Sequence, residues 1–150
     1  MRLKLLTKIM AVAAVATPLM TAAAEAYELV IPATVYRTGP YAPNGIPFAN
    51  GYGDYFRMLN ARDGGIEGVK IKYLECETAY NTKQGVECYE NTKGEGPSGA
   101  LAYQPLSTGI TYQLIPKATN DKIPVFSMGY GRTSASNGKV FPYIFNFPAT

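Results

Sequence analysis

Apolar and polar residues follow two different periods along the chain, and the changes between these periods predict the elements of the fold. Four segments have strand patterns, the second by apolar–polar alternation and the others as short apolar runs: Glu28–Tyr36, Val69–Cys76, Ala100–Tyr103 and Ile123–Ser127. Three intervening segments have helical spacing or helix-starting residues: Phe48–Arg62, Lys83–Thr92 and Ile110–Asn120. Strand and helix therefore alternate, which predicts a parallel sheet with helices on both faces. A further extended apolar segment is expected at Phe141–Phe147.

Glycine and proline residues mark the ends of these elements. Thr38–Pro47 holds three prolines and two glycines, which predicts an open loop after the first strand, where α/β proteins receive ligands. Gly64–Gly65 ends the first helix. Gly94–Gly99 matches the spacing of a dinucleotide-binding loop, but it precedes a strand and is interpreted as a turn. Pro116 is expected to kink the third helix or to end it early.

The first 26 residues have the pattern of an export signal. Met1–Lys8 is basic, Ile9–Met20 is almost wholly apolar, and Thr21–Ala26 is rich in small residues. The apolar run is shorter than the roughly 20 residues that span a bilayer. We therefore expect a signal peptide over residues 1–26, cleavage after Ala26 and an exported, periplasmic protein.

Charge and composition exclude several functions. Without residues 1–26 the chain holds 11 basic and 10 acidic residues, so no nucleic-acid partner is expected. Histidine is absent, which removes Ser–His and Cys–His catalysis and most zinc sites. Glu75 and Glu77 form a candidate acid–base pair, but a solvated strand end is the favoured interpretation. We therefore expect that the protein is not an enzyme and that it binds no metal and no cofactor.

Two cysteines, Cys76 and Cys88, lie at the end of the second predicted strand and in the next predicted helix. In an exported protein such a pair favours a disulfide. Two buried free thiols, or a metal pair, are the alternatives.

Candidate ligand-binding residues lie near the carboxyl ends of the predicted strands. Ser107 and Thr108 open the third predicted helix, where a hydroxyl and free N–H groups suit an anion, although an ordinary helix cap is the alternative. Aromatic rings at a strand end can stack on a ligand. Four tyrosines have such positions: Tyr36, Tyr41, Tyr103 and Tyr130.

Four motifs follow one another in an order that resembles a known family. They are GPYAPNG at Gly39–Gly45, LNARDGGIEG at Leu59–Gly68, TKQGV at Thr82–Val86 and LST at Leu106–Thr108. Together they look like the first half of the N-terminal lobe of the leucine/isoleucine/valine-binding proteins. These are the periplasmic substrate-binding components of ABC transporters for branched-chain amino acids, amides and related solutes. The similarity covers about residues 29–150.

The resemblance implies an α/β fold, the Rossmann-like parallel-sheet lobe of a type I periplasmic binding protein. Residues 27–150 would be part of the N-terminal lobe of a two-lobed protein that closes on its ligand. The apolar run Val140–Thr150 has no polar tail, and we expect the sequence to stop partway through a longer protein. The implied function is solute binding for an ABC importer of branched-chain amino acids, amides or aromatic acids. Its partners would be the solute and a permease in the inner membrane, and the full-length protein would be a monomer. A periplasmic ligand sensor that feeds a signalling receptor is the alternative.

The resemblance also implies ligand-binding residues. In the family a hydroxyl residue at the position of Thr108 holds the ligand's carboxylate and ammonium groups, together with the loop that matches Gly129–Gly131. Gly131 stands where the family often has threonine, and Asn44 stands where amino-acid binders often have tyrosine. The predicted ligand-binding set is Tyr41, Asn44, Tyr103, Ser107, Thr108, Gly129, Tyr130 and Gly131.

Overall fold

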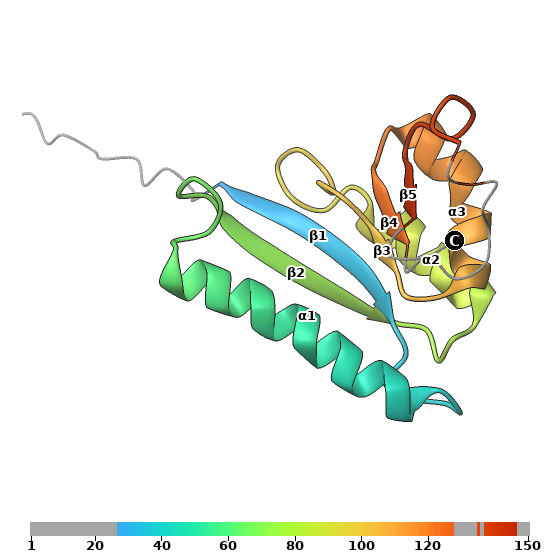
Figure 1. Cartoon of the computed structure of the whole chain (residues 1–150), viewed down its shortest axis with the longest axis horizontal. Coiled ribbons are helices and arrows are strands. Elements are labelled where there is room, and N and C mark those ends of the chain that lie inside the picture. Colours follow the sequence, from blue (N-terminus) through green and yellow to red (C-terminus); the bar gives the residue numbers. More distant parts are fainter. Residues whose placement is uncertain (1–26, 128–134, 136, 147–150) are drawn as a thin grey trace, which may run out of the picture.

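A computed structural model of the chain describes residues 27–127, 135 and 137–146. The predicted signal, residues 1–26, lies outside the described residues. The elements are, in order, β1 (Glu28–Val35), α1 (Ala42–Arg62), β2 (Lys70–Glu77), α2 (Thr82–Thr92), β3 (Gln104–Pro105), α3 (Thr108–Asp121), β4 (Val125–Ser127) and β5 (Ile144–Asn146) (Figure 1). No helix in the described part of the chain is long and apolar enough to cross a membrane.

The five strands of the described residues pair with one another in parallel. β1 pairs with β2 along its whole length, from Glu28 opposite Lys70 to Val35 opposite Glu77, and it pairs on its other side with β3. β4 pairs with β5, and a parallel bridge between Tyr103 and β4 joins the two groups of strands. The strand order is therefore β2-β1-β3-β4-β5. The predicted parallel α/β fold is confirmed.

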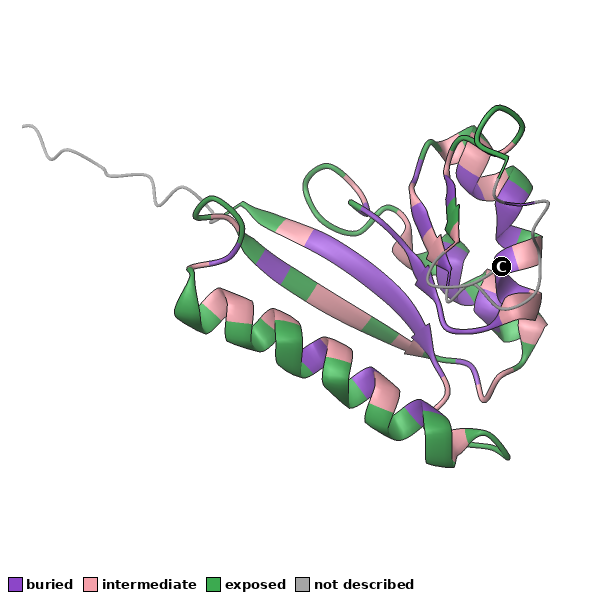
Figure 2. Ribbon diagram, in the orientation of Figure 1, coloured by how far each residue is buried: buried purple, intermediate pink, exposed green. Residues whose placement is uncertain are grey.

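Two apolar clusters hold the helices on opposite faces of this sheet. On one face Ile110 and Leu114 of α3 are fully buried with Tyr89 of α2, together with Tyr103 and Val125 of the sheet. On the other face α1 runs along β2, where Tyr52 and Phe56 contact Tyr73, and its first turns pack against the end of β1. That smaller cluster consists of Val35, Ala49 and Leu106, with Tyr36 and Phe48 packed against it. Figure 2 shows the buried residues concentrated along β1 and on the inner sides of α2 and α3.

The first helix begins earlier than predicted, because Pro43, Gly45 and Pro47 belong to it. α1 begins at Ala42, with Pro43 in its first turn, where a missing N–H breaks no helical hydrogen bond. Gly45 lies against Tyr36 at the end of β1, and a Cβ there would overlap the Tyr36 carbonyl oxygen and ring. The glycine therefore allows the helix to approach the strand closely, and the predicted loop over residues 38–47 was wrong from residue 42 onward.

The third strand also differs from its prediction. The segment 100–103 makes only isolated bridges, and the regular strand is Gln104–Pro105. The reason is a change of partner: the N–H of Leu101 bonds to the Val30 carbonyl of β1, at 2.8 Å, whereas the N–H of Tyr103 bonds to the segment before β4. The segment thus crosses from one neighbour to the other and pairs fully with neither.

The third helix continues through Pro116 to Asp121, so the predicted early end is wrong. Leu114 and Ala118 on either side of the proline are fully buried, and this burial holds the helix together despite the lost N–H donor. The predicted turn at Gly94–Gly99 is confirmed, since Gly96 and Gly99 both have positive φ angles.

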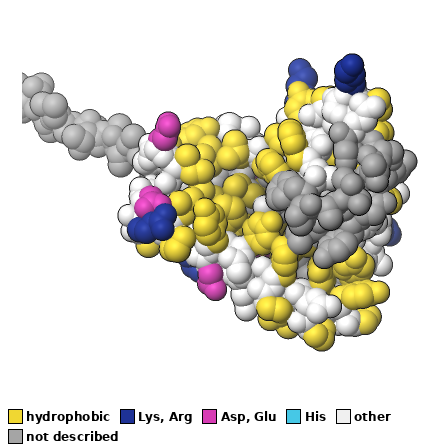
Figure 3. Space-filling model, in the orientation of Figure 1, with side chains coloured by type: hydrophobic (Ala, Val, Ile, Leu, Met, Phe, Trp, Pro, Cys, Tyr) yellow, Lys and Arg dark blue, Asp and Glu magenta, His cyan; other side chains and the backbone are white. Residues whose placement is uncertain are grey.

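One apolar face beside α1 remains open in the described structure. An open hollow of about 580 Å³ lies there, lined by Pro47, Phe48, Gly51, Tyr52, Tyr55, Phe56 and Gln104. Phe126 of β4 and Phe145 of β5 stack on each other with ring centroids 5.3 Å apart, and Phe145 is 45% exposed. Figure 3 shows that hydrophobic side chains gather in the central part of the visible surface.

Candidate functional site

A cavity of about 370 Å³ lies at the carboxyl ends of the strands. It is lined by Tyr36, Tyr41, Asn44, Phe48, Tyr80, Leu106, Ser107, Thr108 and Ser127. The chain leaves β1 toward β2 on one side and leaves β3 toward β4 on the other, so the cavity lies at the point where the strand order reverses. Ligands of open α/β sheets bind at such a point. The structure brings five of the candidate residues together here: Tyr36, Tyr41, Asn44, Ser107 and Thr108.

One part of the cavity wall is formed by hydroxyl groups at the start of α3. Ser107 is the N-cap, and its Oγ accepts a hydrogen bond from the N–H of Ile110 at 3.4 Å. Thr108 is the first helical residue, and Ser127 ends β4 nearby in the cavity lining. The N-terminus of a helix carries a partial positive charge and free N–H groups. This part of the wall therefore suits a carboxylate.

Another part of the wall is aromatic. The ring of Tyr80 lies between two other tyrosines, with its centroid 4.9 Å from Tyr36, edge to face, and 4.5 Å from Tyr41. Such contacts are favourable for aromatic rings and hold their orientation. The three residues come from two loops, the β1–α1 loop (residues 36–41) and the β2–α2 loop (residues 78–81). We refer to them as the tyrosine trio.

The placement of Tyr103 corrects its prediction. Tyr103 is fully buried, and its ring packs against Tyr89 of α2 with centroids 4.9 Å apart. Burial raises the pKa of its phenol to about 12. Its place at the end of a predicted strand indicates the ligand-binding edge of the sheet, but successive side chains of a strand point to opposite faces. The face on which α2 and α3 pack receives Tyr103, which therefore belongs to the core.

Tyr80 was missed, although the rule that selected Tyr36 applies to it equally. It follows the end of β2 by three residues, and the carboxyl ends of parallel strands meet at one edge of the sheet. Phe48 and Leu106 also line the cavity and were not predicted to do so. The predicted residues Gly129, Tyr130 and Gly131 lie outside the described residues.

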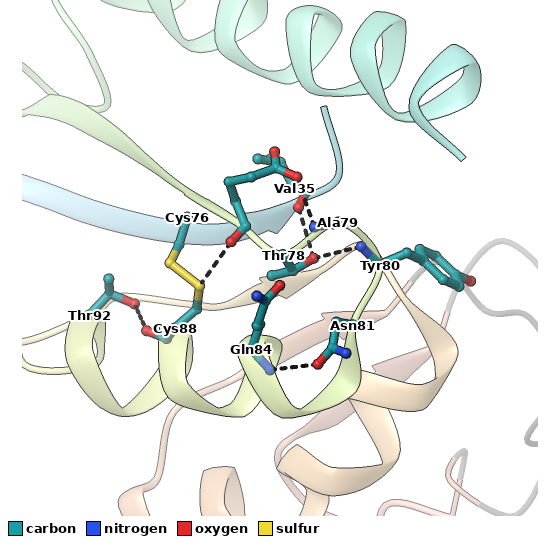
Figure 4. The surroundings of a disulfide bond; sticks show 10 residues. Val35, Cys76, Thr78, Ala79, Tyr80, Asn81, Gln84, Cys88 and Thr92 are labelled. Carbon is teal, nitrogen blue, oxygen red and sulfur yellow. Dashed lines mark hydrogen bonds between the residues drawn. A yellow bond between two sulfur atoms is a disulfide. The ribbon is translucent and has the colours of Figure 1, made fainter. Parts of the chain in front are cut away.

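The disulfide predicted between Cys76 and Cys88 is present, with the two Cα atoms 5.8 Å apart. It links the end of β2 to α2 and so spans the loop that carries Tyr80 (Figure 4). Asn81 caps α2 in the same region, where its side chain accepts a hydrogen bond from the N–H of Gln84. The β2–α2 loop is thus anchored at both of its ends.

Glu75 and Glu77 lie at an exposed strand end, as expected, yet both carboxylates have partners. Glu75 accepts two hydrogen bonds from the guanidinium of Arg37, at 2.6 and 2.7 Å. Glu77 accepts hydrogen bonds from backbone N–H groups, beginning with that of Arg37. These bonds hold both carboxylates as acceptors, which does not fit an acid–base pair. Among the described residues, no group of three or more His, Cys, Asp or Glu side chains is placed to hold a metal.

An α/β lobe with a ligand-sized cavity at the switch point of its sheet defines a class of small-molecule receptors. Residues 28–150 match the family model described as periplasmic binding protein. The chain therefore belongs to the periplasmic binding protein family, whose members are substrate-binding proteins of transport systems. No individually curated protein matches the chain.

Solved structures agree with this assignment. One described as an ABC transporter permease, from the Pseudomonas fluorescens group, is 41% identical over 79% of this chain, with a TM-score of 0.74. A branched-chain amino acid ABC transporter protein from Thermus thermophilus with bound valine is 20% identical over 82%, with a TM-score of 0.72. A solute-binding protein from R. palustris in complex with 4-hydroxybenzoate is 15% identical over 82%, with a TM-score of 0.65. The chain spans 29%, 31% and 32% of these three proteins, respectively.

Proposed function

We propose that this chain forms part of the first lobe of a periplasmic solute-binding protein that serves an ABC importer. The observation that carries the proposal is the cavity, in which the start of α3, with its hydroxyl groups, forms one part of the wall and the tyrosine trio forms another. A solute with a carboxylate and an apolar or aromatic group matches this combination. Branched-chain amino acids and aromatic acids such as 4-hydroxybenzoate have both features, and structural neighbours bind valine and 4-hydroxybenzoate.

The proposed mechanism is binding without chemical change. The carboxylate would lie at the start of α3, near Thr108, and the apolar group would pack on the tyrosines. A second lobe would close over the solute, and solute binding would shift the equilibrium from open to closed forms. The closed form would then dock on a permease in the inner membrane. In this proposal the signal at residues 1–26 directs export to the periplasm, and the full-length protein is a monomer.

The importer is preferred to a sensor that feeds a signalling receptor. The structural neighbours are described as ABC transporter proteins, which supports a transport partner. Deletion of the gene should abolish uptake of the radiolabelled solute that the purified protein binds. Normal uptake together with a lost transcriptional response to that solute would instead identify a sensor.

Calorimetric titration of the complete gene product tests the proposal directly. The panel would hold leucine, valine, phenylalanine, 4-hydroxybenzoate and benzamide, and at least one carboxylate should bind more tightly than the amide. Replacing Thr108→Ala should weaken that binding by about 1–3 kcal/mol, because a buried carboxylate loses one of its donors. Thr108→Ser, which keeps the hydroxyl, should bind nearly as well as the wild type.

A second variant separates binding from helix capping. Ser107→Ala removes the N-cap of α3 and should lower the free energy of unfolding by about 1 kcal/mol. Failure of all five compounds to bind would refute the proposed solute class. Equal affinities of Thr108→Ala and the wild type would remove Thr108 from the binding site.

A further inference from the structure

Glu77, the last residue of β2, holds two loops at once through its carboxylate. Its Oε2 atom accepts a hydrogen bond from the N–H of Arg37 at 2.7 Å. Its Oε1 atom accepts from the N–H of Ala79 at 2.8 Å, and from the hydroxyl and N–H of Thr38 at 3.0 and 3.3 Å. Arg37 and Thr38 belong to the β1–α1 loop and Ala79 belongs to the β2–α2 loop. One carboxylate therefore joins the two loops that carry the tyrosine trio.

The Arg37 side chain extends the connection to α1. Its Nε and Nη2 atoms donate to Glu75, and its Nη1 atom donates to Asn50 Oδ1 of α1 at 2.8 Å. A guanidinium paired with a carboxylate through two bonds is a well-defined geometry that resists rotation. The β1–α1 loop is thus fixed to β2 by Glu75 and Glu77, and to α1 by Asn50.

The β2–α2 loop has a conformation that needs such support. Ala79 and Tyr80 are both left-handed, with φ angles of +48° and +65°, a conformation that is strained for residues other than glycine because the Cβ crowds the following carbonyl oxygen. The N–H of Ala79 bonds to Glu77, and the N–H of Tyr80 bonds to the hydroxyl of Thr78 at 3.2 Å (Figure 4). Thr78 itself donates to the carbonyl of Val35 at 2.9 Å. Side chains on either side of the turn therefore stabilise the strained backbone that directs Tyr80 toward the cavity.

The two loops also touch directly, so movement of one affects the other. A Cβ placed on Gly39 would come within 3.2 Å of the carbonyl oxygen of Ala79. Tyr80 contacts Tyr36 and Tyr41 of the opposite loop through its ring. The spacing of the three rings therefore depends on how the loops are held together.

We propose that Glu77 is a positioning residue for the binding cavity, which holds the tyrosine trio in place and thereby sets which apolar group of a solute fits. The inference rests on the proposed solute-binding function, but it concerns a residue that does not line the cavity. It predicts that loss of the carboxylate loosens both loops together and weakens binding through them. Glu77 touches no solute in this scheme.

Hydrogen–deuterium exchange of the complete gene product tests the connection without a ligand. In Glu77→Gln, peptides that cover residues 36–44 and 78–81 should exchange at least several-fold faster than in the wild type, whereas α3 should not change. Glu90→Gln is the matched control, because Glu90 pairs with Lys93 and Lys117 and does not line the cavity. Glu75→Gln should speed exchange in residues 36–44 alone, since it leaves the bonds to Ala79 intact.

Titration of the same variants with phenylalanine and 4-hydroxybenzoate tests the effect on binding. Glu77→Gln should weaken the tighter of the two compounds by roughly tenfold, and Glu90→Gln should leave it unchanged. Unchanged exchange in either loop overturns the inference, as does wild-type affinity in a Glu77→Gln protein whose loops exchange faster. If neither compound binds the wild type, the proposal that the protein binds aromatic carboxylates fails, and the exchange data still decide whether Glu77 holds the loops.

Discussion

Replacing Gly45→Ala should destabilise the protein, although alanine is the better helix former. Gly45 lies in the first turn of α1, and a Cβ there would approach the carbonyl oxygen and ring of Tyr36 to less than 3.0 Å, a separation that real Cβ atoms essentially never show. The carbonyl belongs to the backbone just after β1 and cannot rotate away. The start of α1 must therefore move from the strand, together with Asn44 and Tyr41, which line the cavity.

Two opposing terms set the size of this effect. Overpacking costs about 1–3 kcal/mol, and contact with backbone places this site at the upper end of that range. The change from glycine to alanine in a helix contributes about 1 kcal/mol in the other direction. The free energy of unfolding should therefore fall by about 2 kcal/mol. Urea denaturation of the complete gene product measures it, and titration with the solute should show weaker binding in the same variant.

Gly53→Ala is the matched control in the same helix. The three atoms nearest to a Cβ at Gly53 all belong to the guanidinium of Arg57, an exposed and flexible group 3.1 Å away, so this variant should be as stable as the wild type or up to about 1 kcal/mol more stable. The two alanine variants should thus differ in their free energy of unfolding by about 2–3 kcal/mol, the sum of the two predicted effects. A Gly45→Ala protein as stable as Gly53→Ala would refute the close packing of α1 on the end of β1.

Three further predictions concern the disulfide, acid stability and the open apolar face. The double replacement of Cys76 and Cys88 by alanine should lower the free energy of unfolding by about 2–4 kcal/mol, because the bond closes a loop with a sequence separation of 12 residues. In the wild-type protein, mass spectrometry of non-reduced peptides should find the two cysteines linked. Two free thiols would contradict this. Burial opposes ionisation of Glu77, but the N–H groups of Arg37, Ala79 and Thr38 outweigh it and lower its pKa below 4.5. A carboxyl group whose pKa is lower in the folded than in the unfolded state stabilises the folded state at pH values above its unfolded pKa. The free energy of unfolding should therefore fall as the pH drops below about 4.5, and it should fall less steeply in Glu77→Gln. Residues 27–150 expressed alone should associate through the face that exposes Phe145, and a monomeric, cooperative thermal transition would contradict this.

The order of strands and helices could be predicted because each element has a local pattern of its own: alternation, a short apolar run, helical spacing or a helix-starting residue. Val69–Cys76 alternates, and β2 occupies nearly the same residues. The start of α1 could not be predicted in this way, since Pro43 and Gly45 indicate a loop when they are considered alone. Only the contact with Tyr36 explains why a glycine occurs inside the helix, and that contact joins residues of different elements.

For the candidate site, the sequence predicted the edge of the sheet correctly but not the face of the sheet toward which each side chain points. Position after a strand selects the correct edge of the sheet, which explains why Tyr41, Ser107 and Thr108 meet at one cavity. It does not select the face, and Tyr103 lies in the core because its side chain points toward α2. The face depends on which helices cover the sheet, and no local pattern specifies this.

The role of Glu77 shows a further limit of sequence patterns. Glu77 was considered with Glu75 as a possible acid–base pair, because two carboxylates at alternate positions suggest shared chemistry. The structure gives them separate partners: Glu75 binds a guanidinium, and Glu77 binds backbone N–H groups that every residue except proline provides. A backbone donor has no sequence signature, so a side chain that organises loops through such donors cannot be recognised from its neighbours. Such residues are found from the geometry of the loops, here from two successive left-handed residues beside the cavity.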